Sequence, residues 1–325
     1  MNKSTIILGK TRLSVSRVAL GTWQLSPRFW GDVPTPQVAE AMRTAFDLGL
    51  NFFDTADAYG DGLAESVLGE TLQAVPRDRV VIATKVFNHY VPDGTRYPDL
   101  SSAHIRERCE DSLRRLRTDF IDLYLLHFYD QLTPLPLVAE TMEVLKAQGK
   151  IRHYGVSNFN IEELRAAVAA GNFAVLHPPY SLINLEAEQL LFPFCLAHDI
   201  GIMVYSPLHK GLLTGKYQGT EIFTDFRKYH PDFQGERFRR IAEAVQGLAP
   251  LANQYGTSIY QLVLAATLTH PAIHVAIIGV KTSDQVREAV GAMEKRIDRP
   301  DYFRIRQILN FAAPPKIKDA GGTIK

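Results

Sequence analysis

The stretch that decides the fold reads Asn51-Phe52-Phe53-Asp54-Thr55-Ala56-Asp57-Ala58-Tyr59-Gly60. Its apolar pair follows Gly49, a residue type that commonly ends a helix, and predicts a short buried strand that stops at Asp54. A turn of small residues then presents the phenol of Tyr59. A carboxylate at a strand end followed by a tyrosine is a weak signal alone, so its meaning depends on the neighbouring segments.

The alternation of a short apolar run with a helical pattern repeats along the whole chain. Buried strands are predicted over residues 18–20, 52–54, 80–85, 121–126, 154–156, 174–176, 202–205 and 275–278. Helices are predicted over 36–48 (capped by Thr35), 64–72, 101–116, 137–148, 161–170, 188–198, 237–255, 258–269 and 285–293. Eight strand–helix units favour an α/β fold, a (β/α)8 TIM barrel with a parallel sheet.

Two segments lie outside this alternation. Residues 5–17 predict a short N-terminal hairpin, and the loop after the seventh strand, about 206–234, is long enough to suggest a function. A doubly wound sheet is the second candidate, but Gly60-Asp61-Gly62 is followed by Glu65 where a dinucleotide fingerprint needs glycine. One barrel domain is therefore expected over 1–312, followed by a polar, loosely ordered tail over 313–325.

Composition limits the class of protein. The chain has 325 residues, 46% of them hydrophobic, which is ample for a core. The net charge of +1 and the lack of a long basic run give no reason to expect nucleic acid. No apolar run could span a bilayer, and the start lacks the apolar core of a signal peptide. Cys109 and Cys195 have no metal-binding spacing and are interpreted as reduced core thiols of a cytoplasmic protein.

Three strand ends and one loop carry groups that can move a proton. In such a barrel, strand C-terminal ends face the active-site mouth, and here they carry Asp54, Lys85 and His127, with Tyr59 on the following loop. Each residue also has an ordinary structural interpretation. Asp54 could be a helix-cap or turn residue and Lys85 a solvated strand end, while His127 could be a core histidine and Tyr59 an aromatic lid. Their joint occurrence favours a site in which an ammonium lowers the pKa of the phenol and a histidine orients a carbonyl. Side chains cannot supply hydride, so the chemistry requires a nicotinamide.

Several motifs then point to one family. They are Gly21-Thr22-Trp23, Asp54-Thr55-Ala56 with Tyr59-Gly60, Thr84-Lys85, Leu125-Leu126-His127, Gly155-Val156-Ser157-Asn158-Phe159, Tyr205-Ser206-Pro207-Leu208 with Gly211-Leu212-Leu213-Thr214-Gly215-Lys216, and Ile278-Gly279-Val280-Lys281 through Gln285. With them the chain resembles the aldo-keto reductases over nearly its whole length. The resemblance implies NAD(P)H-dependent reduction of aldehyde, ketone or sugar carbonyls, and the reverse. It implies Tyr59 as proton donor, tuned by Asp54 and Lys85, with His127 orienting the substrate.

The resemblance also implies a cofactor site. Ser157 and Asn158 would hold the carboxamide, Tyr205 would stack on the nicotinamide, and the 206–216 loop would follow the pyrophosphate. The full predicted set is Gly21, Thr22, Trp23, Asp54, Ser157, Asn158, His177, Tyr205, Ser206, Pro207, Leu208, Gly211, Gly215, Lys216, Gly279, Lys281, Gln285 and Glu288. Lys281 and a helix N-terminus suit a phosphate dianion, which favours NADP(H), with NAD(H) as a second acceptable cofactor. No metal ligand set is predicted.

Two departures from the family pattern stand near this site. His177 occupies the usual position of a glutamine and is expected to be a neutral partner that could become charged below neutral pH. Ala289 follows Glu288 where the family usually has asparagine. A non-enzymatic nicotinamide-binding regulator is a rival hypothesis, whereas a short-chain dehydrogenase would need Tyr-x-x-x-Lys, which is absent. The particular carbonyl or alcohol substrate and the oligomeric state stay open.

Overall fold

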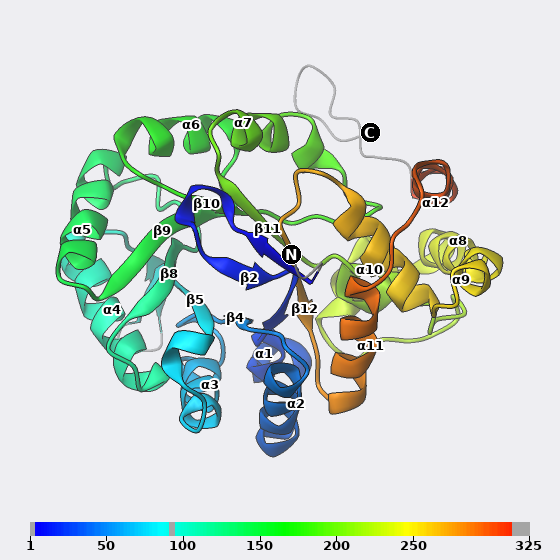
Figure 1. Ribbon diagram of the computed structural model, residues 1–325, viewed down its shortest axis with the longest axis horizontal. Coiled ribbons are helices and arrows are strands. Elements are labelled where there is room, and N and C mark those ends of the chain that lie inside the picture. Colours follow the sequence, from blue (N-terminus) through cyan, green and yellow to red (C-terminus); the bar gives the residue numbers. More distant parts are fainter. Residues whose placement is uncertain (1–3, 91–94, 314–325) are drawn as a thin grey trace.

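The computed structural model describes residues 4–90 and 95–313, and eight parallel strands within them close into a barrel (Figure 1). Around the barrel the strands follow the order β10-β11-β12-β3-β4-β5-β8-β9. They are β3 (Val18–Gly21), β4 (Phe52–Asp54), β5 (Val81–Val86), β8 (Ile121–Leu126), β9 (Ile151–Ser157), β10 (Val175–His177), β11 (Gly201–Tyr205) and β12 (Val275–Gly279). The predicted (β/α)8 barrel is confirmed, and each predicted strand is present.

A ring of helices covers the outside of the barrel (Figure 1). The helices between successive strands, and the one after β12, are α2 (Thr35–Asp47), α3 (Leu63–Leu72), α4 (Ser102–Leu116), α5 (Leu135–Ala147), α6 (Ile161–Ala170), α7 (Leu191–Ala197), α10 (Ile259–Thr269) and α11 (Ser283–Met293). Further helices are α1 (Pro27–Trp30), α8 (Gly235–Gln246), α9 (Ala249–Gln254) and α12 (Arg299–Ala312). Because helices cover one face of each strand and side chains fill the barrel, strands such as β5 and β8 are buried at every position.

Two antiparallel hairpins are added to the barrel. The predicted N-terminal hairpin pairs β1 (Thr5–Ile7) with β2 (Ser14–Ser16), and the adjoining Leu8 and Val15 pack against inward-facing residues of the barrel strands. This hairpin lies across the barrel in Figure 1. A second hairpin, which the sequence analysis missed, pairs β6 (Asn88–Tyr90) with β7 (Arg96–Pro98) directly after β5.

Prolines explain where the predicted helices were wrong. The single helix predicted over 237–255 is two helices, α8 and α9, because Pro250 lacks the N–H that a continuous helix needs and sits in the first turn of α9. The helix predicted over 188–198 begins only at Leu191, since Pro193 is tolerated only near a helix start. Thr35 does not cap α2, because it is the first helical residue and Pro34 occupies the N-cap without a side-chain bond.

Two regions contain more structure than expected. The long loop after β11 holds three 3-10 segments, His209–Thr214, Phe226–Tyr229 and Pro231–Phe233. Helix α12 was missed, although its buried residues recur at helical spacing, and it packs against α8 and α10. Apart from Ala313, the predicted C-terminal tail lies outside the described residues.

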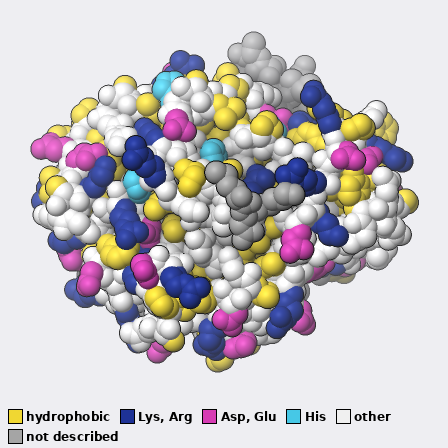
Figure 2. Space-filling model, viewed as in Figure 1, with side chains coloured by type: hydrophobic (Ala, Val, Ile, Leu, Met, Phe, Trp, Pro, Cys, Tyr) yellow, Lys and Arg dark blue, Asp and Glu magenta, His cyan; other side chains and the backbone are white. Residues whose placement is uncertain are grey.

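The surface and the core are those of an ordinary globular protein. Basic and acidic side chains are interspersed on the face seen in Figure 2. Cys109 and Cys195 are both free and buried, as predicted. Within the described part of the chain, no helix combines the length and apolar character needed to cross a bilayer.

A buried carboxylate ties together the N-terminal ends of three strands. Asp122, at the start of β8, has no exposed surface and accepts bonds from Arg77 at 2.7 Å and Arg152 at 2.9 Å. It also accepts the N–H of Ile82 in β5 at 3.0 Å. Arg152 belongs to β9, so one side chain holds the lower ends of β5, β8 and β9.

We expect Asp122→Ala to destabilise the fold by about 3 kcal/mol, since breaking a buried ion pair leaves unpaired charges and a donor without an acceptor. Removing one partner of a buried pair typically costs about 3–5 kcal/mol. Arg77 and Arg152 are partly exposed and regain some hydration in the variant, so we expect a loss of stability at the low end of this range. Chemical denaturation followed by circular dichroism measures the change. The matched control, Asp119→Ala at an exposed position, should change stability by less than about 0.5 kcal/mol. Equal stability of the two variants would contradict a supporting role for Asp122.

Candidate active site

The predicted proton-transfer residues converge at the C-terminal mouth of the barrel. Nζ of Lys85 lies 2.8 and 2.9 Å from the two carboxylate oxygens of Asp54 and 2.7 Å from the carbonyl oxygen of Thr55. The same nitrogen lies 3.4 Å from the hydroxyl oxygen of Tyr59. Lys85 has no exposed surface and Asp54 is 2% exposed, so the charge of the lysine is compensated inside the protein.

Strand register explains this convergence. In the parallel pairing of β4 with β5, Asp54 lies opposite Ala83, so Lys85 extends one inward-facing position further toward the mouth. The turn after β4 is fixed by N–H bonds from Thr55 to the carbonyl of Ala83 and from Tyr59 to the carbonyl of Ala56. The phenol is therefore held over the lysine by backbone hydrogen bonds.

His127 completes the predicted group of four. It follows β8, its N–H donates to the carbonyl of Val86 at 3.0 Å, and its ring meets that of Tyr59 edge-on at 5.8 Å between centroids. Burial, and next the positive charge of Lys85, lower the pKa of His127 to about 3. The imidazole is therefore neutral at physiological pH, and one ring nitrogen can donate a hydrogen bond while the other accepts.

The electrostatics of Tyr59 differ from the expectation. Burial, followed by the carboxylates of Asp54 and Asp57, raises the pKa of Tyr59 well above its ordinary value, whereas an ammonium was expected to lower it. Burial also raises the pKa of Asp54 and lowers that of Lys85, and their mutual contact opposes both shifts. The phenol therefore keeps its proton at neutral pH, and Lys85 faces the oxygen from which that proton would leave.

Asp57 was not singled out from the sequence. It is buried, and neither carboxylate oxygen has a hydrogen-bond partner among the described residues. Burial and the nearby Glu65 raise its pKa to about 8, against the opposing charge of Arg115. Its position three residues after Asp54 in the same turn is the only sequence signal that could have identified it.

Residues predicted to hold a carboxamide form a hydrogen-bonded set of their own. The amide nitrogen of Asn158 donates to the carbonyl of His127 at 2.9 Å and to the hydroxyl of Ser157 at 3.0 Å. Its amide oxygen accepts the hydroxyl of Tyr205 at 2.6 Å. Asn158 has a φ of 60°, in the left-handed region that asparagine tolerates better than most residues. Asn158 thus joins the ends of β8, β9 and β11.

His177 lies within this set, where its neutral form is fixed. It is 2% exposed at the end of β10, with Nδ1 3.3 Å from the Ser157 hydroxyl and its ring edge-on to Tyr205 at 5.0 Å. Burial, then the charge of Lys85, lowers the pKa of His177 well below its ordinary value. The expectation that His177 could become charged just below neutrality is therefore wrong. Its Nε2 is buried without a partner and is available to a ligand.

The first-strand motif lies beside the proton-transfer group. The hydroxyl and the N–H of Thr22 both donate to the carbonyl of Asp54, at 3.1 and 3.0 Å. Gly21 and Gly279 pair across β3 and β12, and a side chain on Gly279 would meet Gln24 at 2.7 Å. Trp23 packs instead into a cluster of aromatic rings described below.

The loop after β11 has an unusual backbone. Ser206, His209 and Lys210 all have positive φ, of 58°, 46° and 56°, although none is glycine. Such residues are disfavoured and tend to cluster at functional sites. Gly211 has a φ of 91°, and a side chain there would lie 3.3 Å from Nζ of Lys216. Pro207 and Leu208 are buried beneath the loop, and Gly215 packs against Ile259 of α10.

The predicted phosphate residues surround the start of α11. Thr282 caps this helix, and the side-chain oxygen of Gln285 accepts the N–H of Lys281 at 2.7 Å, so only its amide NH₂ stays available. Burial lowers the pKa of Lys281, and Arg227 and Lys216 act in the same direction. Glu288 accepts the hydroxyl of Ser258, the N-cap residue of α10, at 2.6 Å.

Arg227 and its aromatic neighbours were also missed. Trp23, Trp30 and Phe226 pack with centroids 4.9–5.3 Å apart, which brings the start of the chain against the long loop. Both Lys281, at 5.3 Å, and Arg227, at 5.5 Å, lie over the ring of Trp30. Arg227 also pairs with Asp225. No sequence pattern links residues so far apart, and only the folded loop brings them together.

The fold and these side chains define a TIM-barrel protein with the predicted proton-transfer residues at the C-terminal ends of its strands. The family model described as "Aldo/keto reductase family" matches residues 17–310. A relative named "Aldo-keto reductase YhdN" from Bacillus subtilis is 36% identical over 324 residues, covering 95% of this chain and 97% of that protein. The chain belongs to the aldo/keto reductase family.

Other relatives differ in what their names say. An "NADH-specific methylglyoxal reductase" from Escherichia coli is 32% identical and covers 93% of this chain and 97% of its own length. A "putative voltage-gated potassium channel subunit beta" from Schizosaccharomyces pombe is also 32% identical, covering 94% of this chain and 92% of its own. Family membership alone therefore leaves the cofactor and the activity to be argued from the site.

Solved structures agree with the fold. A glycerol dehydrogenase from Gluconobacter oxydans superimposes with a TM-score of 0.90 at 30% identity, over 98% of this chain and 99% of that one. An aldo-keto reductase from Klebsiella pneumoniae in complex with NADPH has a TM-score of 0.76, also at 30% identity, over 97% of this chain and 96% of that one.

The lowered pKa of His127 predicts a pH-dependent stability. In the unfolded chain, histidine binds a proton below pH ~6.5. In the folded chain, His127 stays neutral down to about pH 3, so the two states bind different numbers of protons between these values. The free energy of unfolding should therefore fall as the pH drops below ~6.5. Because the ring is partly exposed at the mouth, we expect about 1–2 kcal/mol from this residue between pH ~6.5 and ~5. Urea unfolding of His127→Asn measures this contribution. Between pH ~6.5 and ~5, the free energy of unfolding of the variant should fall by about 1–2 kcal/mol less than that of the parent. Identical pH profiles of parent and variant would contradict the lowered pKa.

Proposed function

We propose that the protein is an NADPH-dependent carbonyl reductase that converts aldehydes, ketones or sugar carbonyls to alcohols, and can run the reverse reaction. The observation that carries the proposal is the chain of contacts from Asp54 through Lys85 to the hydroxyl of Tyr59, with neutral His127 beside the same ring. A buried phenol that keeps its proton and faces an ammonium is suited to give that proton to a carbonyl oxygen. A cytoplasmic location is part of the proposal, supported by the two free buried cysteines.

The side chains at the mouth fit a nicotinamide cofactor. The buried, unpartnered Nε2 of His177 and the polar set of Ser157 and Asn158 suit a carboxamide. The hydroxyl of Tyr205 is fixed by Asn158, which holds its ring in place for stacking. In the 206–216 loop, backbone N–H groups and Lys216 suit a pyrophosphate. When bound, the reduced nicotinamide supplies the hydride that no side chain of this chain can supply.

The chain's own residues supply the proton and the orientation. His127, neutral at physiological pH, would donate a hydrogen bond to the substrate carbonyl oxygen. Tyr59 would release its proton to the same oxygen as negative charge develops there. Lys85, 3.4 Å from the phenol oxygen, would stabilise the resulting phenolate, and Asp54 keeps the lysine in position.

Tyr59→Phe tests the proton donor, since it retains the ring and removes the acid. General acid catalysis is typically worth ~10²–10⁴-fold, so kcat should fall by that factor while NADPH affinity stays near the parent value. Cofactor absorbance with a panel of carbonyls measures turnover, and protein fluorescence measures cofactor binding. Tyr255→Phe removes a hydroxyl that is hydrogen-bonded to Asp301 and Asp298, away from the mouth, and should leave kcat unchanged. A Tyr59→Phe variant with parental turnover would show that another group donates the proton.

Lys281→Met tests the preference for NADPH. A lysine–phosphate contact should contribute on the order of 1–3 kcal/mol, by analogy with hydrogen bonds to charged groups. NADPH binding should then weaken by roughly ten- to a hundred-fold, while NADH binding hardly changes. Arg227 also lies over Trp30, so it can still attract the phosphate when Lys281 is replaced. We therefore expect a loss of NADPH affinity closer to ten-fold than to a hundred-fold. Lys295→Met, two residues beyond the end of α11, is the control. Equal losses for both cofactors would contradict recognition of the phosphate by Lys281.

The rival function is that of a nicotinamide-binding regulator. Its support is the channel-subunit name of one relative. The same carbonyl and alcohol panel decides between the two, because a regulator would bind NADPH without turning over any substrate. The four proton-transfer residues favour the reductase.

A further inference from the structure

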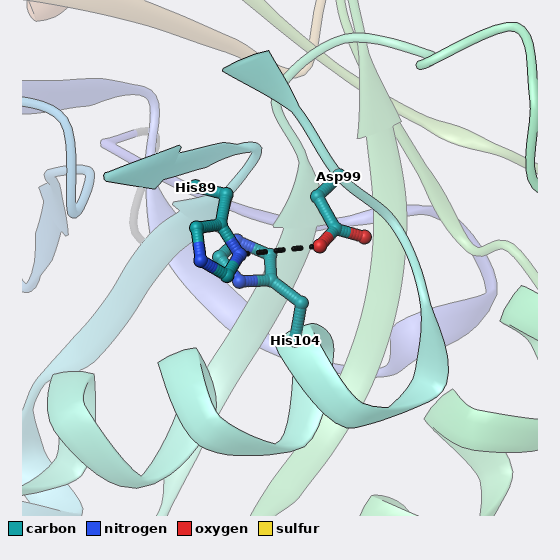
Figure 3. A group of neighbouring side chains, drawn as sticks. All are labelled: His89, Asp99 and His104. Carbon is teal, nitrogen blue, oxygen red and sulfur yellow. Dashed lines mark hydrogen bonds and ion pairs between the residues drawn. The ribbon is translucent and has the colours of Figure 1, made fainter. Parts of the chain in front are cut away.

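Three potential metal ligands converge outside the proton-transfer site, beside the hairpin that follows β5. His89 lies on β6, Asp99 precedes α4, and His104 lies in the first turn of α4. Nδ1 of His89 is 3.3 Å from Oδ2 of Asp99, and one ligand atom from each residue lies within 4.8 Å of the others. Figure 3 shows the two rings and the carboxylate gathered at one point.

The environment of the His104 ring points to a ligand. His104 is only 4% exposed, yet neither of its ring nitrogens has a hydrogen-bond partner among the residues that the structure describes. The backbone of Asn88 lies near enough to favour the protonated ring without reaching hydrogen-bond geometry. A buried polar group without a partner costs free energy, and a bound cation would remove that cost.

The other two ligands are held in place by neighbouring contacts, and Nδ1 of His89 and Oδ2 of Asp99 contact each other. Oδ1 of Asp99 accepts the N–H of Ser101 at 2.8 Å, which leaves Oδ2 for His89. The ring of His89 stacks on His104 and on Tyr97, each at 4.9 Å between centroids. The side chain of His89 is 34% exposed, so an ion has a path from solvent.

We propose that His89, Asp99 and His104 bind a divalent transition-metal ion of the zinc class. Two imidazoles and one carboxylate are a donor set that suits Zn²⁺, with the fourth position left for water. The ion would join the β6–β7 hairpin to α4, two residues beyond Phe87, whose ring meets Phe128 next to His127. The site does not depend on the proposed reduction, so each can fail separately. No sequence pattern indicates this site, because residues 89 and 99 come together only through the pairing of the hairpin.

A second cluster, His209, His230 and Asp232, has similar spacing but a different charge environment. Arg237 pairs with Asp232 at 2.5 Å, and Nζ of Lys210 lies 3.3 Å from His230. A cation there would meet two positive side chains and a carboxylate that is already neutralised. At the proposed site, Arg108 acts on His104 but is itself paired with Glu107 at 2.8 Å and with Asp111.

The test is calorimetric titration of the full chain with Zn²⁺ after removal of metals by a chelator. We expect one ion per chain and a rise in the unfolding temperature with added Zn²⁺, because a ligand that binds only the folded state stabilises it. His89→Gln and His104→Gln should each weaken binding by at least about tenfold, since even outer-shell changes at metal sites cost that much. His89 is partly exposed, so its variant should fold even if the His104 variant does not.

The matched control is His230→Gln, which removes a histidine from the second cluster and should leave Zn²⁺ binding unchanged. Three results would overturn the proposal. They are a parent chain that binds no Zn²⁺, binding that His89→Gln leaves unaltered, and binding that His230→Gln abolishes. The last result would assign the metal to the second cluster.

Discussion

The ammonium of Lys85 has no exposed surface and is compensated where it lies, by both oxygens of Asp54 and the carbonyl of Thr55. Removing one partner of such a buried pair typically costs about 3–5 kcal/mol, so the two side chains fix each other. Their contact requires β4 and β5 to keep one register, because a slip of one residue would turn one of them out of the mouth. Barrel closure therefore sets the position of the charge, and the charge in turn sets the environment of Tyr59.

Neutral groups surround this one compensated charge. Burial and the field of Lys85 lower the pKa of both His127 and His177, so the imidazoles at the ends of β8 and β10 carry no charge at physiological pH. Neutral imidazoles can donate and accept hydrogen bonds without opposing the lysine. Burial raises the pKa of Asp57 to about 8, so this carboxyl group is also mostly neutral at pH values below that. The mouth thus concentrates its electrostatic effect on the phenol oxygen.

The eight strands could be read from the sequence because buried parallel strands appear as short apolar runs, and the residues at their ends follow from barrel geometry. Asp54, Lys85, Tyr59 and His127 were found this way. What could not be read depends on tertiary contacts. The pKa of Tyr59 was predicted with the wrong sign, because its burial outweighs the neighbouring ammonium. Arg227 and Trp30 come into contact only when the long loop folds. The break between α8 and α9 was missed because the helical spacing of apolar residues continues across Pro250, which a continuous helix does not tolerate.

The residues proposed for proton transfer and those proposed for cofactor preference lie on different parts of the chain. The four proton-transfer residues depend on strand register and on one tight turn, which tolerate little change. Lys281 and Arg227 sit instead on connecting segments, where substitutions disturb few backbone contacts. Their cations share the ring of Trp30, so a change in the long loop would alter the charge proposed to face the phosphate without moving Lys85. This separation is consistent with relatives near 30% identity that differ in cofactor, one named for NADH and another crystallised with NADPH. In the function proposed for this chain, cofactor preference is therefore set by the loops, while proton transfer depends on the barrel.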